Sequence, residues 1–387
     1  MIYLDNAATS FPKPEPVYRA LDQFARTQLA NPGRSSHRMA KEAERTIENT
    51  RLLLNRMFNG ESPERWIFTL NCTDGLNMAI KGSVKPDDHV ITSDLEHNSV
   101  SRPLRQLEKD GVISLTRLAS NDGYLDPEDV RRALTPKTAL VVLTHAANVL
   151  GTLQPIEAIA PIVREAGALM IVDAAQSAGV VPIDLRKTPI DLLAFPGHKS
   201  MYGPTGTGAF YVGPRATLRP WREGGTGGDS KFPTQPLELP HALEGGTPNA
   251  LGIAGLAAGV QWVMEHGQET SRLHEVALLQ KIVDWVDAQG KNDGWKVAGR
   301  WEPSAHVGAL SLITPNLEEF HPQDLAEMLD TSFDIAVRPG LHCAPYIHQR
   351  LGTYPDGTLR VSPGPFNTAE EIDTFLNALT EITAGVL

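Results

Sequence analysis

Short apolar runs alternate with segments of helical periodicity through the first two thirds of the chain. The runs lie at 66–68, 89–91, 139–143, 168–172 and 191–195. Apolar runs that do not alternate with polar residues, and that lie between helices, are typical of a parallel sheet covered on both faces. We therefore expect an α/β domain that binds its ligands at the carboxyl ends of the strands.

One strand-to-helix junction is predicted in detail. Residues 66–70 are expected to form a strand that leads into a helix beginning near Thr73. The apolar residues that follow have the i, i+3, i+4 spacing of one helical face, at Leu76, Ala79 and Ile80. Such a junction would present backbone N–H groups and the Thr73 hydroxyl to an anion such as phosphate, although a Thr here is also an ordinary helix cap.

The last third of the chain has a different pattern. The expected helices lie around 250–266, 270–289 and 321–331, and the expected strands around 306–314, 334–340 and 358–363. Thr368 and Glu371 have the spacing of a capping box ahead of a final amphipathic helix. This mixture predicts a smaller α+β domain. We expect residues 16–259 to form the large domain, and residues 1–15 and 260–387 to form the small one.

Residues 222–249 lie between the two patterns and have no apolar period. They contain six glycines and four prolines. A loop of this length inside a compact chain is usually functional or disordered. Its Gly-rich ends, 224–228 and 244–249, would allow close backbone approach to a ligand or to a partner subunit.

Composition and charge narrow the class of protein. The chain has 387 residues, 41% of them hydrophobic and 21% charged, which excludes collagen-like, coiled-coil and disordered chains and allows one large domain with a smaller one. The net charge of −11 argues against a sequence-independent nucleic-acid binder and against binding to an anionic membrane surface.

The number of cysteines and the lengths of the apolar segments indicate the cellular compartment. Cys72 and Cys343 are the only two cysteines, too few for a disulfide framework, and they fit a reducing compartment. The first residues contain no basic region ahead of an apolar stretch, and no window of 18 uncharged apolar residues occurs. We expect a cytoplasmic protein, and no metal site is predicted.

A lysine and an aspartate follow successive predicted strands. Lys199 comes between an apolar strand and a Gly-rich turn at 203–208, and Asp173 closes the preceding strand. Taken singly, these are a surface lysine and a helix cap. Together they are what a pyridoxal phosphate site needs, because a desolvated lysine forms a Schiff base and the aspartate keeps the pyridine nitrogen protonated.

Other candidates lie at strand ends and turns. His97 could stack on an aromatic cofactor or transfer protons, although a lone His is more often structural. Cys343 lies in a Gly/Pro turn with Arg338 and His342 nearby to favour the thiolate, which fits a nucleophile, whereas Cys72 is interpreted as a packing residue. Arg360, on a predicted strand, could bind a substrate carboxylate through two hydrogen bonds.

These ordered motifs resemble those of class V pyridoxal-phosphate enzymes with the aspartate-aminotransferase fold, and among them the cysteine desulfurases and selenocysteine lyases. The similar segments extend nearly end to end, at 3–9, 96–97, 148–152, 172–176, 197–199, 245–249 and 338–343. The resemblance implies a fold type I transferase with a mostly parallel seven-stranded sheet in the large domain. It also implies pyridoxal 5′-phosphate as cofactor and a homodimer.

The resemblance implies a role for individual positions. The expected catalytic residues are Lys199 as the Schiff-base lysine, Cys343 as the thiol that accepts sulfur, and His97 as the stacked imidazole and a proton shuttle. The remaining cofactor-binding positions are Asp173, Gln176, Asn148, Thr73, Cys72, His198 and Thr247, the last from the second subunit. The substrate-binding positions are Arg360, which matches the carboxylate-binding arginine, and Asn148, Arg338 and Ala8.

Two features distinguish this chain within that family. Pro196 stands where many relatives carry a phosphate-binding Ser, so one hydroxyl contact to the phosphate is missing. The segment 338–343 resembles the subgroup with a compact active-site loop, whose partners are sulfur-acceptor proteins. The amino-acid sequence of 344–348 is not the commonest one in the family.

The sequence therefore predicts an enzyme that converts L-cysteine to L-alanine and leaves a persulfide on Cys343. Alternatives with the same cofactor are a selenocysteine lyase, a cysteine or cystine C–S lyase, a transaminase and an epimerase. The thiol favours desulfuration, because β-elimination and transamination do not need it. A different class is a non-catalytic module that binds a nucleotide through the Gly-rich turns. Neither turn matches a phosphate-binding loop or a dinucleotide fingerprint.

Overall fold

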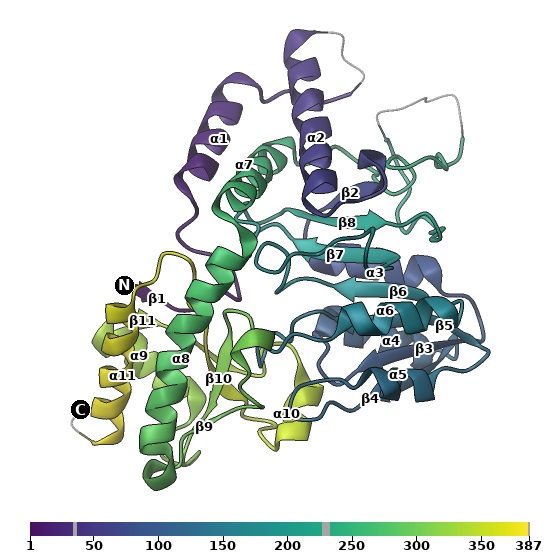
Figure 1. The fold of residues 1–387 in the computed structure, drawn as a ribbon. Helices are drawn as coiled ribbons and strands as arrows, with labels where there is room; N and C mark the ends of the chain where they lie inside the picture. Colours follow the sequence, from purple (N-terminus) through teal and green to yellow (C-terminus); the bar gives the residue numbers. More distant parts are fainter. Residues whose placement is uncertain (34–36, 227–232, 386–387) are drawn as a thin grey trace.

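A seven-stranded sheet forms the centre of the structure, a computed structural model that describes residues 1–33, 37–226 and 233–385 (Figure 1). Across the sheet the strands are β2 Trp66–Thr69, β8 Gly208–Val212, β7 Leu192–Pro196, β6 Leu169–Asp173, β5 Thr138–Thr144, β3 Asp88–Ser93 and β4 Ile113–Leu118. Within it, β8 runs antiparallel to both neighbours and the other pairs are parallel. The predicted α/β fold with a mostly parallel sheet is confirmed.

Both faces of this sheet are buried, which explains the continuous apolar runs. In β5, Val141 and Leu143 pack in one hydrophobic core, while Leu140 and Val142 pack in another on the opposite face. The first core is covered by α2 Arg38–Met57, α5 Pro127–Ala133, α6 Ile156–Glu165 and α7 Ala250–His266. The second is covered by α3 Cys72–Ser83 and α4 Asn98–Lys109. The amino-terminal helix α1, Glu15–Thr27, packs on α7.

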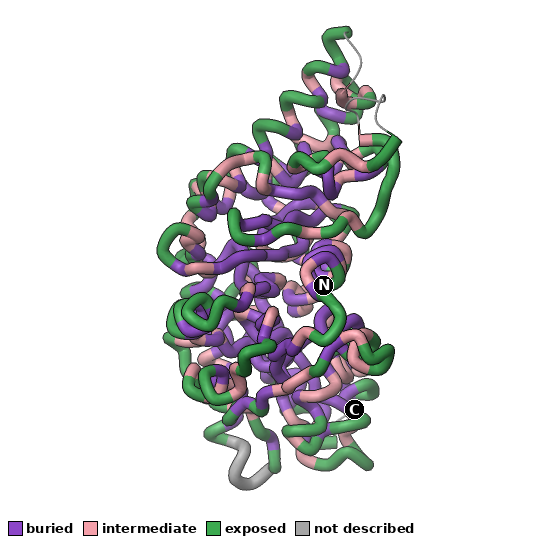
Figure 2. The backbone as a smooth tube through the Cα atoms, turned by 90° about the vertical axis from the view of Figure 1, so that its right-hand side faces the viewer, coloured by how far each residue is buried: buried purple, intermediate pink, exposed green. Residues whose placement is uncertain are grey.

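The rest of the chain forms a smaller α+β part. Its antiparallel sheet has the order β12 Arg338–Gly340, β13 Thr358–Val361, β10 Leu310–Ile313 and β9 Lys296–Val297. The helices around it are α8 Gln268–Asp293, α9 Pro322–Phe333, α10 Pro345–Leu351 and α11 Ala369–Thr383. Figure 2 shows buried backbone running through the middle of both parts, with exposed segments around it.

The amino-terminal residues join this smaller part. The short strand β1, Ile2–Tyr3, pairs in parallel with β11, Ile335–Ala336, and Leu4 packs in the same core as Phe375 of α11. This pairing supports the proposed division into domains 16–259 and 1–15 with 260–387, which stays a prediction.

Several predicted elements have different bounds in the structure. The capping box is present, with Thr368 accepting from the Glu371 N–H and starting α11. The strand expected over 306–314 is shorter, because His306 pairs with Thr152 and the Val307 N–H donates to Gly151 O at 2.8 Å, so this stretch bonds to the large part instead. The described residues of 222–249 form no helix or strand before α7, and 227–232 lie outside the described residues.

No helix in the part of the chain that the structure describes is both long enough and apolar enough to cross a membrane.

Candidate active site

A cavity of about 200 Å³ lies at the carboxyl ends of the large sheet's strands and is closed by the small sheet's β12 and β13. Most of the predicted site residues line it: Ala8, Cys72, Thr73, His97, Asn148, Asp173, Gln176, His198, Lys199, Arg338 and Arg360. Cys343 and Thr247 do not line this cavity. Residues from five strand ends, the amino terminus and the small part therefore meet at one place, where open α/β sheets bind ligands.

Lys199 is held by a short loop after β7, the lysine turn, defined here as residues 197–203. The turn is closed by hydrogen bonds from Gly203 N to Gly197 O at 2.7 Å and from Tyr202 N to Lys199 O at 2.8 Å. The amino-terminal segment braces it, because Ser10 Oγ donates to Lys199 O at 2.9 Å. Burial, followed by the Arg360 charge, lowers the pKa of Lys199 to about 8. Its amine is therefore partly uncharged near neutral pH, as a nucleophile requires.

The lowered pKa of Lys199 leads to a measurable prediction for the cofactor-free protein. Its acetylation rate by pulsed acetic anhydride, followed by mass spectrometry, is expected to rise through a midpoint near pH 8, because only the neutral amine reacts. A lysine in a short model peptide, with a midpoint near pH 10.4, is the reference. Equal midpoints for the two would show that the Lys199 amine is hydrated and ordinary.

Asp173 lies at the end of β6, opposite the lysine, and is only 2% exposed. Its Oδ1 accepts from Ala175 N at 2.9 Å and from Cys72 Sγ at 3.5 Å. Burial raises the pKa of Asp173, and these bonds and the Lys199 charge act against that shift. A buried carboxylate is stable only with a cationic partner, so the chemistry of this site fits a ligand with a protonated ring nitrogen.

His97 caps α4, and this position determines its tautomer. Its Nδ1 accepts from the Ser99 N–H at 3.0 Å and lies 2.8 Å from Ser99 Oγ. Because a backbone N–H can only donate, Nδ1 is unprotonated and the ring proton lies on Nε2. Burial, and then the Lys199 and Arg338 charges, lower the pKa of His97 to about 4. The ring is neutral, which favours stacking on a flat ligand over the predicted proton shuttle.

One end of the cavity suits an anion. Asn71 caps α3 by accepting from Asp74 N at 2.9 Å, and the first N–H groups of the helix, at Cys72 and Thr73, have no partner within the helix. Thr73 Oγ1 lies 2.8 Å from Ser99 Oγ. His198 Nδ1 is buried and has no hydrogen-bond partner among the described residues. Pro196 lines the same wall and contributes no hydroxyl.

The opposite end suits a carboxylate. Arg360, 2% exposed, donates from Nη2 to Asp5 Oδ1 at 2.9 Å and from Nη1 to Asn148 O at 3.0 Å, while its Nε has no partner among the described residues. Arg338 lies beside it in the β12–β13 register, and its guanidinium makes no hydrogen bond or ion pair with a described residue. Asp5, which holds Arg360, was not singled out from the sequence, and only the resemblance of segment 3–9 pointed to it.

Amide side chains complete the walls of the cavity. Asn148 donates from Nδ2 to His342 O at 2.6 Å, and its buried Oδ1 has no partner among the described residues. Gln176 donates from Nε2 to Ala7 O at 3.0 Å. Thr247 is exposed and lies outside the cavity of its own chain.

Cys343 is an exposed thiol on a turn that follows β12, directly after His342, which lines the cavity. Both residues have left-handed backbone, with φ of 60° and 48°, and Cys343 O accepts from Asn98 N at 2.7 Å. Strain of this kind, about 1–3 kcal/mol per residue, gathers at functional sites. The sequence-based expectation that His342 favours the thiolate is wrong, because burial lowers its pKa well below 6.5 and leaves the ring uncharged. The positive charge that acts on the thiol is that of Arg360.

Comparison with known proteins gives a consistent picture. Residues 2–375 match the family described as aminotransferase class-V. A probable cysteine desulfurase of Pyrococcus abyssi is 34% identical over 100% of this chain and 95% of that protein, and one of Halalkalibacterium halodurans is 35% identical over 98% and 92%. Among solved structures, the apo cysteine desulfurase of Thermococcus onnurineus NA1 has a TM-score of 0.91 at 32% identity, covering 99% of this chain and 95% of that one. A cysteine desulfurase of Escherichia coli has a TM-score of 0.86 at 28% identity, covering 100% and 95%.

Proposed function

Because the chain belongs to the aminotransferase class-V family and is a cysteine desulfurase within it, we propose that it converts L-cysteine to L-alanine through a persulfide on Cys343. The observation that carries the proposal is the position of Cys343. An exposed thiol directly follows a residue of the cavity that holds Lys199 and Asp173. A transaminase or an epimerase has no use for a thiol there.

The cofactor proposed for this cavity is pyridoxal 5′-phosphate, on which class V enzymes depend. The residues present fit this cofactor. Lys199 would bind its aldehyde, Asp173 would pair with its pyridine nitrogen, and the neutral ring of His97 would stack on its face. The α3 amino terminus, Thr73 and the unpartnered His198 Nδ1 would hold the phosphate. When bound, this cofactor withdraws electrons from the substrate Cα and so makes the Cα proton acidic.

The chain's own residues account for substrate binding and proton transfer. Arg360 is fixed by Asp5 and Asn148, so its free Nε and the neighbouring Arg338 can bind the substrate carboxylate without rearrangement. Lys199 takes the Cα proton as general base, since burial lowers its pKa to about 8 and so leaves part of its amine uncharged near neutral pH. Burial raises the pKa of Asp173, so a cationic group that faces it stabilises its ionised form.

The sulfur transfer needs no external oxidant or reductant. The Cys343 thiolate attacks the substrate sulfur and forms an S–S bond, while the Cβ–S bond breaks and its electron pair stays with the carbon skeleton. The skeleton takes up two protons, the one that Lys199 removed from Cα and the one that the substrate thiol gives up, and this yields alanine and leaves the persulfide on Cys343. Cys343 lies on the exposed turn at 342–343, so the outer sulfur of its persulfide can be transferred to an acceptor.

The partners of the chain remain proposals. The exposed Thr247, outside its own cavity, supports a homodimer in which it reaches the phosphate of the second subunit. The exposed Cys343 supports a sulfur-acceptor protein as second substrate. A cytoplasmic location rests on the low cysteine content of the sequence.

A product assay tests the proposed function. The cofactor-loaded protein, given L-cysteine and a reductant, is expected to form alanine and sulfide in equal amounts, and Cys343→Ser is expected to lose at least about 100-fold of this rate, because a hydroxyl cannot accept sulfur. The control is the visible absorbance of the bound cofactor, which Cys343→Ser should retain. Pyruvate in place of alanine, or full turnover by the variant, would show a C–S lyase that does not use the thiol.

A further inference from the structure

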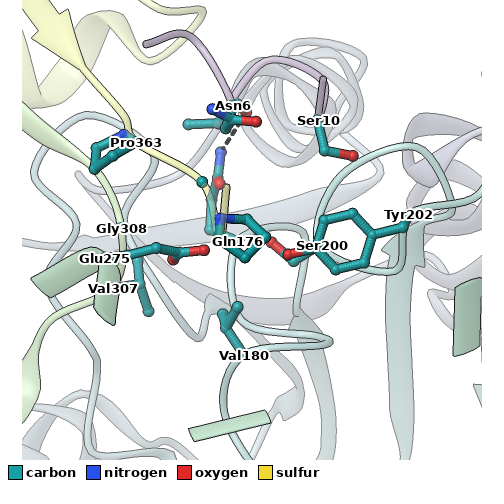
Figure 3. Close-up of a pocket in the computed structure, with 13 residues that line it drawn as sticks. Asn6, Ser10, Gln176, Val180, Ser200, Tyr202, Glu275, Val307, Gly308 and Pro363 are labelled. Carbon is teal, nitrogen blue, oxygen red and sulfur yellow. Dashed lines mark hydrogen bonds between the residues drawn. The ribbon is translucent and has the colours of Figure 1, made fainter. Parts of the chain in front are cut away.

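A second, smaller cavity adjoins the first and shares Ala7 and Gln176 with it. Figure 3 shows the residues that line this second cavity. Its volume is about 20 Å³. Four separate parts of the chain form its walls. They are the amino-terminal segment with Asn6 and Ser10, the loop after β6 with Gln176 and Val180, the lysine turn with Ser200 and Tyr202, and the small part with residues that include Glu275 and Gly308. The cavity therefore contacts two of the elements that shape the active site, Gln176 and the lysine turn.

Glu275, on α8, is the ionisable residue of the small part in this wall. It is 5% exposed, and its carboxyl makes no hydrogen bond or ion pair with a described residue. Figure 3 shows its carboxyl group pointing into the cavity, on the side of Gln176. The mechanism proposed above does not use this carboxyl.

Two glycines leave room for this arrangement. A Cβ at position 308 would overlap Glu275 Oε2, and a Cβ at position 364 would lie 2.8 Å from Asn6 Oδ1. Neither glycine has a left-handed φ, so backbone conformation does not require glycine at either position. Their lack of a side chain is explained by the space that the carboxyl and amide groups occupy.

Among the described residues, no cation forms an ion pair with Glu275. The Lys13 ammonium lies near the same cavity, but it donates to Ser10 Oγ and to His198 O, each at 2.7 Å. On its own helix, Arg272 lies one turn earlier and directs its guanidinium to the carbonyls of Pro303 and His306 and to Glu269. His306 is uncharged, because burial lowers its pKa to about 4, and burial raises the pKa of Tyr202 well above 10. Burial also raises the pKa of Glu275 to about 8, so it is a carboxylic acid near neutral pH and can donate a hydrogen bond.

We propose that protonated Glu275, together with one water molecule in this cavity, positions Gln176 and the lysine turn for the bound cofactor. A cavity of about 20 Å³ exceeds the roughly 10–15 Å³ that one water needs, and polar groups of Asn6, Ser10 and Ser200 supply its other partners. Glu275 is then a positioning residue that couples α8 of the small part to the active site. This inference rests on the proposed function only in taking pyridoxal phosphate as the ligand.

Three variants test the positioning role by cofactor affinity. Titration of cofactor-free protein with pyridoxal phosphate, followed by absorbance, is expected to show an about tenfold weaker Kd for Glu275→Leu, because the hydrogen-bonded link is lost. Glu275→Gln, which keeps the shape and a donor, should bind within about threefold of the wild type. Asp287→Asn, which changes an exposed carboxyl on the same helix, is the matched control. Wild-type affinity in Glu275→Leu would overturn the proposal.

A second readout is independent of cofactor and of catalysis. Since the folded-state pKa of Glu275 is about 8, above its unfolded value, its contribution to stability is complete at low pH and is lost as the pH rises towards 8. The Tm of cofactor-free Glu275→Gln minus that of the wild type should therefore grow between pH 5 and pH 8. A difference that does not change with pH would show an ionised Glu275 and overturn the proposal. Neither readout depends on desulfuration, so a failed product assay would leave this test intact.

Discussion

Replacing Lys199 with alanine is expected to lower the rate of alanine formation from L-cysteine by about 10⁴-fold. The residue supplies the amine for the proposed cofactor and the base for the Cα proton, and the cavity contains no other described lysine. Lys199→Arg should be almost as inactive, because a guanidinium stays protonated in proteins. Initial rates at saturating L-cysteine, with added pyridoxal phosphate, measure the effect.

The control for this prediction is Lys109→Ala, which removes an exposed lysine at the end of α4 and should leave the rate unchanged. Activity of Lys199→Ala above one tenth of the wild type would contradict the assignment of Lys199 as base. Addition of an alkylamine to that variant separates the two roles, since a diffusible amine can replace a lost proton carrier.

Replacing Arg360 with alanine is the second large change, with an expected loss of about 10²–10³ in kcat/KM for L-cysteine, mainly through KM. The guanidinium is buried and its Nε is the free donor towards the proposed carboxylate position. Its removal also leaves Asp5 without its ionic partner. Steady-state kinetics and the Tm of the variant, measured together, distinguish lost binding from lost folding.

Two further variants sharpen this second test. Arg360→Lys keeps one positive charge but cannot reach Asp5, Asn148 and a carboxylate together, so it should restore Tm more than KM. Arg338→Ala removes the neighbouring cation, which no described partner holds. If Arg338→Ala raises KM and Arg360→Ala does not, the carboxylate binds to Arg338 alone.

The central sheet could be predicted because burial on both faces leaves a local signal. The runs at 139–143 and 168–172 became β5 and β6, with alternate side chains in two cores. Strand β8 was not expected, since its Gly-rich approach at 203–208 has the composition of a turn. The single strand expected over 334–340 is two short strands in the structure. β11 pairs with β1 and β12 pairs with β13, in two different sheets, and this pairing leaves no local signal in the sequence.

The site was predictable where chemistry follows a strand end, as for Lys199, Asp173 and His97. It was not predictable where a residue acts through a distant partner. Asp5 meets Arg360 across 355 positions, and the Glu275 carboxyl occupies space that Gly308, far from it in sequence, leaves open. The charge of His342 was misjudged because nearness in sequence to Cys343 does not reveal burial.

The amino-terminal segment has a consequence for biosynthesis. Residues 2–13 pair with β11, hold Arg360 through Asp5, and brace the lysine turn through Ser10. A ribosome makes this segment before β11 and β13, and these partners leave the exit tunnel only after the large sheet has been translated. The large sheet can fold during synthesis, but the catalytic cavity closes only afterwards, so a nascent chain carries an open cofactor site until β13 has emerged.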